Sequence, residues 1–174
     1  MNRIEKYRED LMADLLAVAN GNGLLQGKLL YSEDLDEAWK RLAQSFFPDA
    51  VREFNRYPEY CLGCAGYLGM AVARLWDEDW TVFKDTPYSF FLGSRGFDDM
   101  DDHITGSILK DDGFSVAAMQ SCALEANHFL QKSGTEAGTA EAYRFFLESM
   151  EVMYKLGAAI ELKHLGYEYH KVGV

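Results

Sequence analysis

Residues 139–165 read TAEAYRFFLESMEVMYKLGAAIELKHL, and this stretch decides the fold class. Apolar residues recur in it at every third or fourth position, as they do along a helix with one buried face. The buried face would hold Tyr143, Leu147, Met150, Tyr154, Gly157 and Leu165, and the opposite face Arg144, Glu148 and Lys155. The spacing predicts a long amphipathic helix from about Thr139 to Leu165.

A second amphipathic helix is predicted just before it, from Phe114 to about Gln131. Ser133-Gly134 is a stop signal, so we expect the two helices to form a hairpin that turns near Thr135. In such a hairpin the end of the last helix lies level with the Lys110-Asp-Asp-Gly113 turn.

The remaining chain also has helical spacing, and no segment alternates apolar and polar residues as a strand does. Asp34 with Glu37 resembles a capping box, and Pro48 would end the helix that it opens. The predicted upstream helices cover about residues 4–18, 34–47, 49–56, 58–76 and 97–109, with a further start signal at Thr86-Pro87. The sequence predicts an all-α protein: a compact bundle of six to eight helices with a long C-terminal hairpin, forming a single domain over residues 1–174.

The chain is acidic, with 28 Asp and Glu against 17 Lys and Arg and a net charge of −11. This balance disfavours nucleic acid and anionic membranes as partners, because basic side chains hold both. The longest nearly uncharged run, Tyr60 to Ala73, is shorter than the roughly 20 residues of a membrane helix. A charged N-terminus and an odd number of cysteines, three, favour a cytoplasmic location.

Cys61-Leu-Gly-Cys64 has the spacing of a dithiol redox centre. On a helix in an all-α chain it resembles the alkylhydroperoxidase-like family, which implies thiol-disulfide chemistry at Cys61 and Cys64. In that family a histidine follows the second cysteine by four residues, and Leu68 stands there in this chain. The alternative is packing: Gly63, Gly66 and their small neighbours let another helix approach closely, and helical spacing predicts that both thiols are buried.

Two Glu-x-x-His motifs, Glu125–His128 and Glu161–His164, match a spacing that di-iron bundles use. In the predicted hairpin they lie about 24 Å apart, too far for one centre. Helical spacing places Glu161 and His164 on the buried face, beside Asp111 or Asp112 in the adjacent turn, which predicts a carboxylate and imidazole site for a divalent metal. The alternatives are a hydrogen bond to tyrosine, a salt bridge, or a helix end exposed to water.

An acidic run, Phe97-Asp-Asp-Met-Asp-Asp-His103, contains the Asp-Asp-x-x-Asp spacing by which prenyl-diphosphate enzymes hold magnesium. Acidic residues are also favoured at a helix start, where they cap free N–H groups and oppose the helix dipole. The second explanation is the simpler one, because no matching acidic motif is found elsewhere in the chain.

These patterns favour a protein-interaction or structural module over an enzyme, and they predict a protein partner or self-association. The surface expected to contribute is an aromatic strip, because Tyr and Trp combine large contact area with a polar group. Its members are Tyr57, Tyr60, Tyr67, Trp76, Trp80, Tyr88, Phe90 and Phe91. Two alternatives stay open: a metal-binding protein using Glu161, His164 and Asp111 or Asp112, and a redox protein using Cys61 and Cys64. No cofactor is expected apart from that metal.

Overall fold

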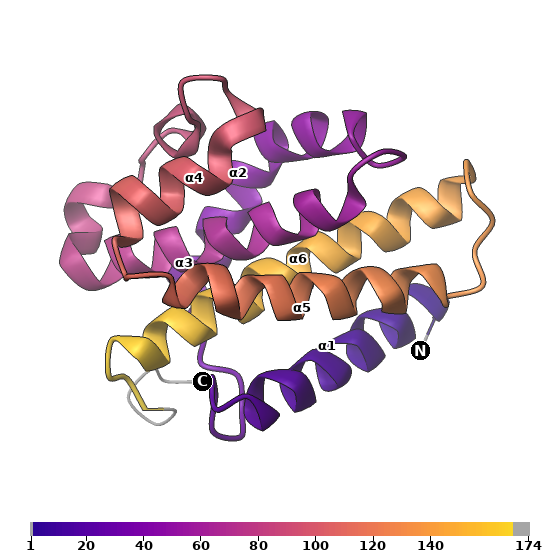
Figure 1. Ribbon diagram of the computed structural model, residues 1–174, viewed down its shortest axis with the longest axis horizontal. Coiled ribbons are helices and arrows are strands. Elements are labelled where there is room, and N and C mark those ends of the chain that lie inside the picture. The colour runs from indigo at the N-terminus through magenta and orange to yellow at the C-terminus, as the bar shows by residue number, and fades with distance from the viewer. Residues whose placement is uncertain (1, 169–174) are drawn as a thin grey trace.

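The computed structural model describes residues 2–168, and these form an all-α fold without a β-strand (Figure 1). The long helices are α1 (Arg3–Gly21), α2 (Glu33–Arg52), α3 (Pro58–Phe83), α5 (Phe114–Gln131) and α6 (Ala140–His164). Shorter helical segments lie between α3 and α5: η1 (Tyr88–Phe91), η2 (Phe97–Asp99), α4 (Met100–His103) and η3 (Ile104–Leu109). The predicted fold class and the C-terminal hairpin of α5 and α6 are confirmed. No helix within residues 2–168 is long and apolar enough to cross a membrane.

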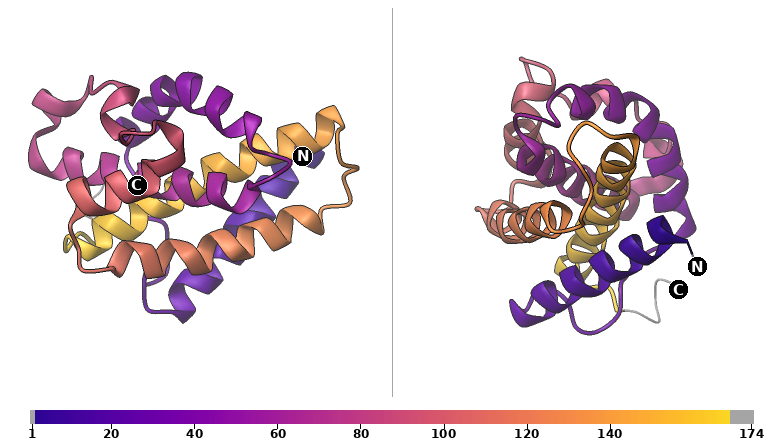
Figure 2. Two further views of the ribbon diagram at one scale, coloured as in Figure 1. Left: turned by 45° about the horizontal axis from the view of Figure 1, so that its top comes forward. Right: turned by 90° about the vertical axis from the view of Figure 1, so that its right-hand side faces the viewer.

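Helix α6 occupies the centre of the bundle. It contacts α1, α2, α3 and α5, and the two views in Figure 2 show it surrounded by these helices. Between Ser149 and Leu162 only Glu151 and Lys155 are not fully buried. The prediction of one buried face was therefore too narrow. Tyr143 was assigned to that face, but it lies in the first turn of α6 and is 39% exposed.

Small residues bring α3 and α6 into backbone contact. A Cβ atom added to Gly157 would overlap the carbonyl oxygen of Gly66, and one added to Gly69 would overlap the carbonyl oxygen of Tyr154. Only glycine fits such a crossing, since any side chain would push the two backbones apart. The predicted packing role of the small residues in α3 is confirmed.

The start and end of α2 differ from the prediction. Ser32 is the N-cap and accepts a hydrogen bond from the Leu35 backbone N–H (3.5 Å), whereas Asp34 accepts one from the Trp76 indole (3.0 Å). The helix also continues through Pro48 to Arg52, so residues 49–52 are its last turn rather than a separate helix. A proline removes one helical hydrogen bond. Burial of Phe46 and Ala50 on either side of Pro48 keeps the turn packed.

Two other segments depart from regular helix. Helix α3 continues past Trp76 to Phe83, with a break at Asp79, whose φ and ψ are −169° and 93°. Residues 97–109 form a 3-10 turn, one turn of α-helix and then a π-helix, instead of one continuous α-helix. The π-helix closes with the Lys110 N–H donating to the Thr105 carbonyl (3.0 Å), and Lys110 adopts a left-handed conformation. Asp101, in the α4 turn, lines a cleft beside α3 and α5.

Candidate functional site

Glu161 is a fully buried carboxylate near the C-terminal end of α6. Its nearest cation is Arg74 of α3, with Nη1 of Arg74 3.6 Å from Oε2 of Glu161. Neither carboxylate oxygen accepts a hydrogen bond. Arg74 is shared, because Nη1 also donates to the Leu109 carbonyl (3.4 Å) and Nε lies 3.7 Å from Oε1 of Glu78. Of the alternatives open at the sequence level, the structure shows a salt bridge.

Burial raises the pKa of Glu161 to about 7. Arg74 opposes this shift, whereas the negative charges of Asp111 and Asp77 add to it. Taking a carboxylate out of water disfavours its charged form, and one partly shared guanidinium does not offset that penalty. The carboxyl group of Glu161 therefore titrates near neutral pH.

The residues considered for a metal do not converge. Asp111 lies near Glu161, but its Oδ1 accepts hydrogen bonds from the N–H (3.2 Å) and hydroxyl (3.1 Å) of Ser115, in the first turn of α5. Asp112 is exposed. His164 is exposed as well, against the prediction, with its ring 4.0 Å from that of Phe114. Within residues 2–168 no three His, Cys, Asp or Glu side chains come together in a way that would hold a metal ion.

The burial of His164 was mispredicted because helical spacing shows which face a residue is on but not how far along the helix that face is covered. The ring lies in the last turn of α6, where water reaches it. Glu125 is half-buried and His128 is exposed on α5, so the other Glu-x-x-His motif lies at the protein surface.

Cys61 and Cys64 are buried free thiols in α3. Cys61 donates a hydrogen bond to the Ala50 carbonyl (3.3 Å), and burial raises its pKa to about 12. Burial also raises the pKa of Cys64 well above its ordinary value. Thiolate is the reactive form of cysteine, and both environments disfavour it.

The acidic run divides into separate roles. Asp99 accepts hydrogen bonds from the Arg95 N–H (3.0 Å) and the Ser94 hydroxyl (3.1 Å), which closes the loop before α4. Asp98 and Asp102 are exposed. Asp101 instead accepts a hydrogen bond from the Tyr60 hydroxyl (3.2 Å) and lines a cleft.

That cleft, of about 680 Å³, lies between the N-terminal half of α3 and α5, and we call it the α3/α5 groove. The groove is deep where Gly63 and Ala123 face each other, because both residues are small. A Cβ atom on Gly63 would be 3.8 Å from the Cβ of Ala123. Its walls carry aromatic and amide side chains. The groove is lined by Asn55, Arg56, Tyr57, Pro58, Glu59, Tyr60, Gly63, Tyr67, Asp101, Met119, Gln120, Ala123, Asn127 and Gln131.

A smaller cavity, of about 300 Å³, extends the groove towards the loop between α5 and α6. The two share Asn55, Pro58, Asn127 and Gln131, so they form one continuous depression. The extension ends near Thr135 and Gly138.

One polar side chain of the groove, that of Asn127, has an unsatisfied hydrogen-bond acceptor. The side-chain oxygen of Asn127 is buried and accepts no hydrogen bond. A buried polar atom without a partner is unfavourable in the free protein, and a donor from a ligand would relieve it. The Tyr60 hydroxyl, in contrast, is fixed by a short hydrogen bond to the Phe97 carbonyl (2.6 Å).

Exposed apolar side chains flank the groove. Tyr57 at its mouth is 59% exposed, and Leu124 is 47% exposed. Leu124 lies on α5 beside the lining stripe, since it is four residues from Gln120 and three from Asn127. Large exposed apolar residues around a depression are typical of a contact surface.

The aromatic strip does not form one surface. Tyr67 and Phe91 are buried, and Tyr88 anchors the fold through a hydrogen bond to Asp49 (2.8 Å). Tyr57, Tyr60 and Tyr67 line the groove. Sequence reasoning identified these tyrosines but missed the amides of α5, although Gln120, Asn127 and Gln131 recur at helical spacing beside the apolar stripe.

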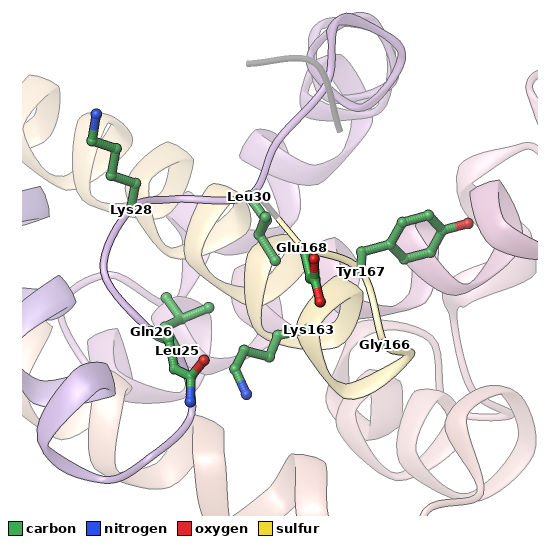
Figure 3. Close-up of a pocket in the computed structure, with 8 residues that line it drawn as sticks. All are labelled: Leu25, Gln26, Lys28, Leu30, Lys163, Gly166, Tyr167 and Glu168. Carbon is green, nitrogen blue, oxygen red and sulfur yellow. The ribbon is translucent and has the colours of Figure 1, made fainter. Parts of the chain in front are cut away.

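Another pocket, of about 260 Å³, lies between residues 25–30 and the end of α6 (Figure 3). Two lysines line it, Lys28 and Lys163, and their ammonium groups point in opposite directions in this view. They do not converge on a common ligand position.

Comparison of the chain with known protein families, curated proteins and solved structures gave no match.

Proposed function

We propose that the protein is a protein-interaction module whose α3/α5 groove binds an extended segment of a partner protein. The observation that carries the proposal is the buried side-chain oxygen of Asn127, which lacks a donor and lines the largest cleft described above. A backbone N–H of the partner supplies that donor.

The residue types in the groove suit a polypeptide backbone. Asn55, Gln120, Asn127 and Gln131 each carry both a donor and an acceptor, which match the alternating N–H and C=O groups of an extended chain. Tyr57 and Leu124 at the rim offer apolar contact to the side chains of such a segment.

The length of the groove also suits a short segment. Along α5 it runs from Met119 to Gln131, which at about 1.5 Å per residue is roughly 18 Å. An extended chain rises about 3.3 Å per residue, so about five residues fill this length. The smaller cavity beyond Gln131 accommodates a continuation of the same segment.

A peptide selection tests the proposal. A random-peptide display library is selected against the full chain, and the enriched peptides are titrated against wild type, Tyr57→Ser and the control Tyr143→Ser. Both variants replace an exposed tyrosine, but Tyr143 does not line the groove. Serine suits position 57, the N-cap of α3, so we expect that variant to fold.

The expected result is that the selected peptides bind wild type and Tyr143→Ser with equal affinity and Tyr57→Ser about tenfold more weakly, as for a contact residue worth about 1.4 kcal/mol. Failure to enrich peptides, or equal binding to all three proteins, would overturn the proposal. A dimer in light scattering that Tyr57→Ser dissociates would also overturn it, because a second copy would then occupy the groove.

A further inference from the structure

One end of the α3/α5 groove is negatively charged and has no cation paired with it. Asp101 lines the groove, and within residues 2–168 no Lys, Arg or His nitrogen lies within 4.0 Å of its carboxylate. Arg56 lines the same groove but does not pair with Asp101. The single hydroxyl proton of Tyr60 is shared between the Phe97 carbonyl (2.6 Å) and Oδ1 of Asp101 (3.2 Å), so the carboxylate of Asp101 keeps most of its capacity to accept hydrogen bonds.

Tyr67 adds an unused polar group at this end. The residue is only 7% exposed, yet its hydroxyl forms no hydrogen bond with any described residue, and it lines the groove. After burial itself, the charge of Asp101 is the largest influence that raises the pKa of Tyr67, and Asp102 and Asp111 act in the same direction. The electrostatic potential at the Tyr67 hydroxyl is therefore negative.

An aromatic ring beside a carboxylate attracts cations in two ways. The carboxylate supplies charge and hydrogen-bond acceptors, and the ring face supplies its quadrupole. Tyr60 presents such a ring, held at 85° to Phe97 with a centroid separation of 5.4 Å. The Tyr67 hydroxyl oxygen is free to accept a further N–H.

We propose that Asp101, Tyr60 and Tyr67 form a subsite for a basic side chain of the bound segment, the guanidinium of arginine or the ammonium of lysine. This inference rests on the proposed function and adds the chemistry of the partner. It matches the overall charge, since a chain of net charge −11 favours basic partners.

Small probes test the subsite without knowledge of the partner. The ¹⁵N-labelled full chain is titrated with N-acetylarginine amide, with N-acetyllysine amide and with N-acetylcitrulline amide, which has nearly the shape of the arginine probe but no charge. We expect saturable shifts of the Tyr60 and Tyr67 amide signals with either basic probe. The citrulline probe should bind about tenfold more weakly, because it lacks a charge-assisted hydrogen bond worth about 1.5 kcal/mol.

Matched variants locate the charge that matters. Asp101→Asn keeps an acceptor for the Tyr60 hydroxyl, so we expect it to fold, and it should weaken the basic probes about tenfold. Asp98→Asn removes the same charge from another residue of the acidic run, which is exposed and does not line the groove, and should leave binding within about twofold.

Equal binding of the citrulline probe to wild type would overturn the subsite, and this comparison needs no variant. Equal weakening by Asp101→Asn and Asp98→Asn would also overturn it. Failure of this inference differs from failure of the proposed function. Groove-dependent peptides without a basic residue would refute the subsite alone, whereas binding of the basic probes with no peptide enriched would refute the proposed function alone.

Discussion

The buried carboxyl of Glu161 links stability to pH. Its pKa in the folded protein is about 7, against an ordinary value of 4.5. Below 4.5 the group is protonated whether the chain is folded or unfolded. As the pH rises from 4.5 to 7 the unfolded chain releases this proton and the folded chain keeps it, so stability is lost. Above 7 the loss is complete, at about 3 kcal/mol.

Glu161→Gln removes this titration. We expect the free energy of unfolding of wild type, relative to Glu161→Gln, to fall by up to about 3 kcal/mol between about pH 4.5 and pH 7.5, as measured by urea denaturation. Glu125→Gln, on the surface of α5, is the control and should follow wild type. Parallel pH profiles for wild type and Glu161→Gln would show that the buried carboxyl does not carry the effect.

At the scale of elements, the crossing of α3 and α6 depends on glycine. Gly157→Ala should destabilise the protein by about 3 kcal/mol or more, because the new methyl group overlaps the backbone of α3 at Gly66. Gly63→Ala, in the same α3 helix, meets nothing closer than 3.8 Å and should be neutral or stabilising by about 1 kcal/mol. Thermal unfolding of the two variants measures the difference. Equal changes in stability for the two variants would show that the close approach at Gly157 does not set the cost.

The elements that the sequence predicted best are those with local signals at both ends. Helix α6 begins at its cap Thr139, whose hydroxyl accepts from the Ala142 N–H (3.2 Å), and α5 ends just before Ser133-Gly134. Pro48 misled the prediction because its local effect is outweighed by the packing of α2. Asp79 and the π-helix at residues 104–109 carry no local signal that fixes their geometry, since tertiary contacts select those conformations.

At the scale of the whole molecule, the excess of acidic residues opposes the compact state. The net charge is −11, and pairs such as Lys6–Asp10 are exposed and weak. Raising the salt concentration from about 0.01 M to about 0.15 M shortens the screening length from about 30 Å to about 8 Å. The thermal midpoint should therefore rise, by about 2–4 °C for each 1 kcal/mol gained. A fall in the midpoint would show that attraction between surface charges dominates.

The candidate site was only partly predictable from the sequence, because it depends on how helices that are distant in the sequence pack together. Burial of Glu161 followed from the spacing within α6, and the closeness of Asp111 followed from the hairpin. The pairing of Glu161 with Arg74 could not be predicted in this way, because Arg74 belongs to α3, which is distant from Glu161 in the sequence. The α3/α5 groove likewise needs the relative placement of α3, α4 and α5, which periodicity within one helix does not specify.

The backbone contact between Gly66 and Gly157 has a consequence for recognition. Because the backbone of α6 lies so close to that of α3, α3 has little room to shift when the proposed segment enters the groove beside it. Conformational change on binding would then be confined to the side chains at the mouth of the groove. Binding would proceed in one kinetic step, without a separate rearrangement of the helices. Affinity can improve chiefly by stiffening the incoming segment, because its disorder is the main entropy lost on binding.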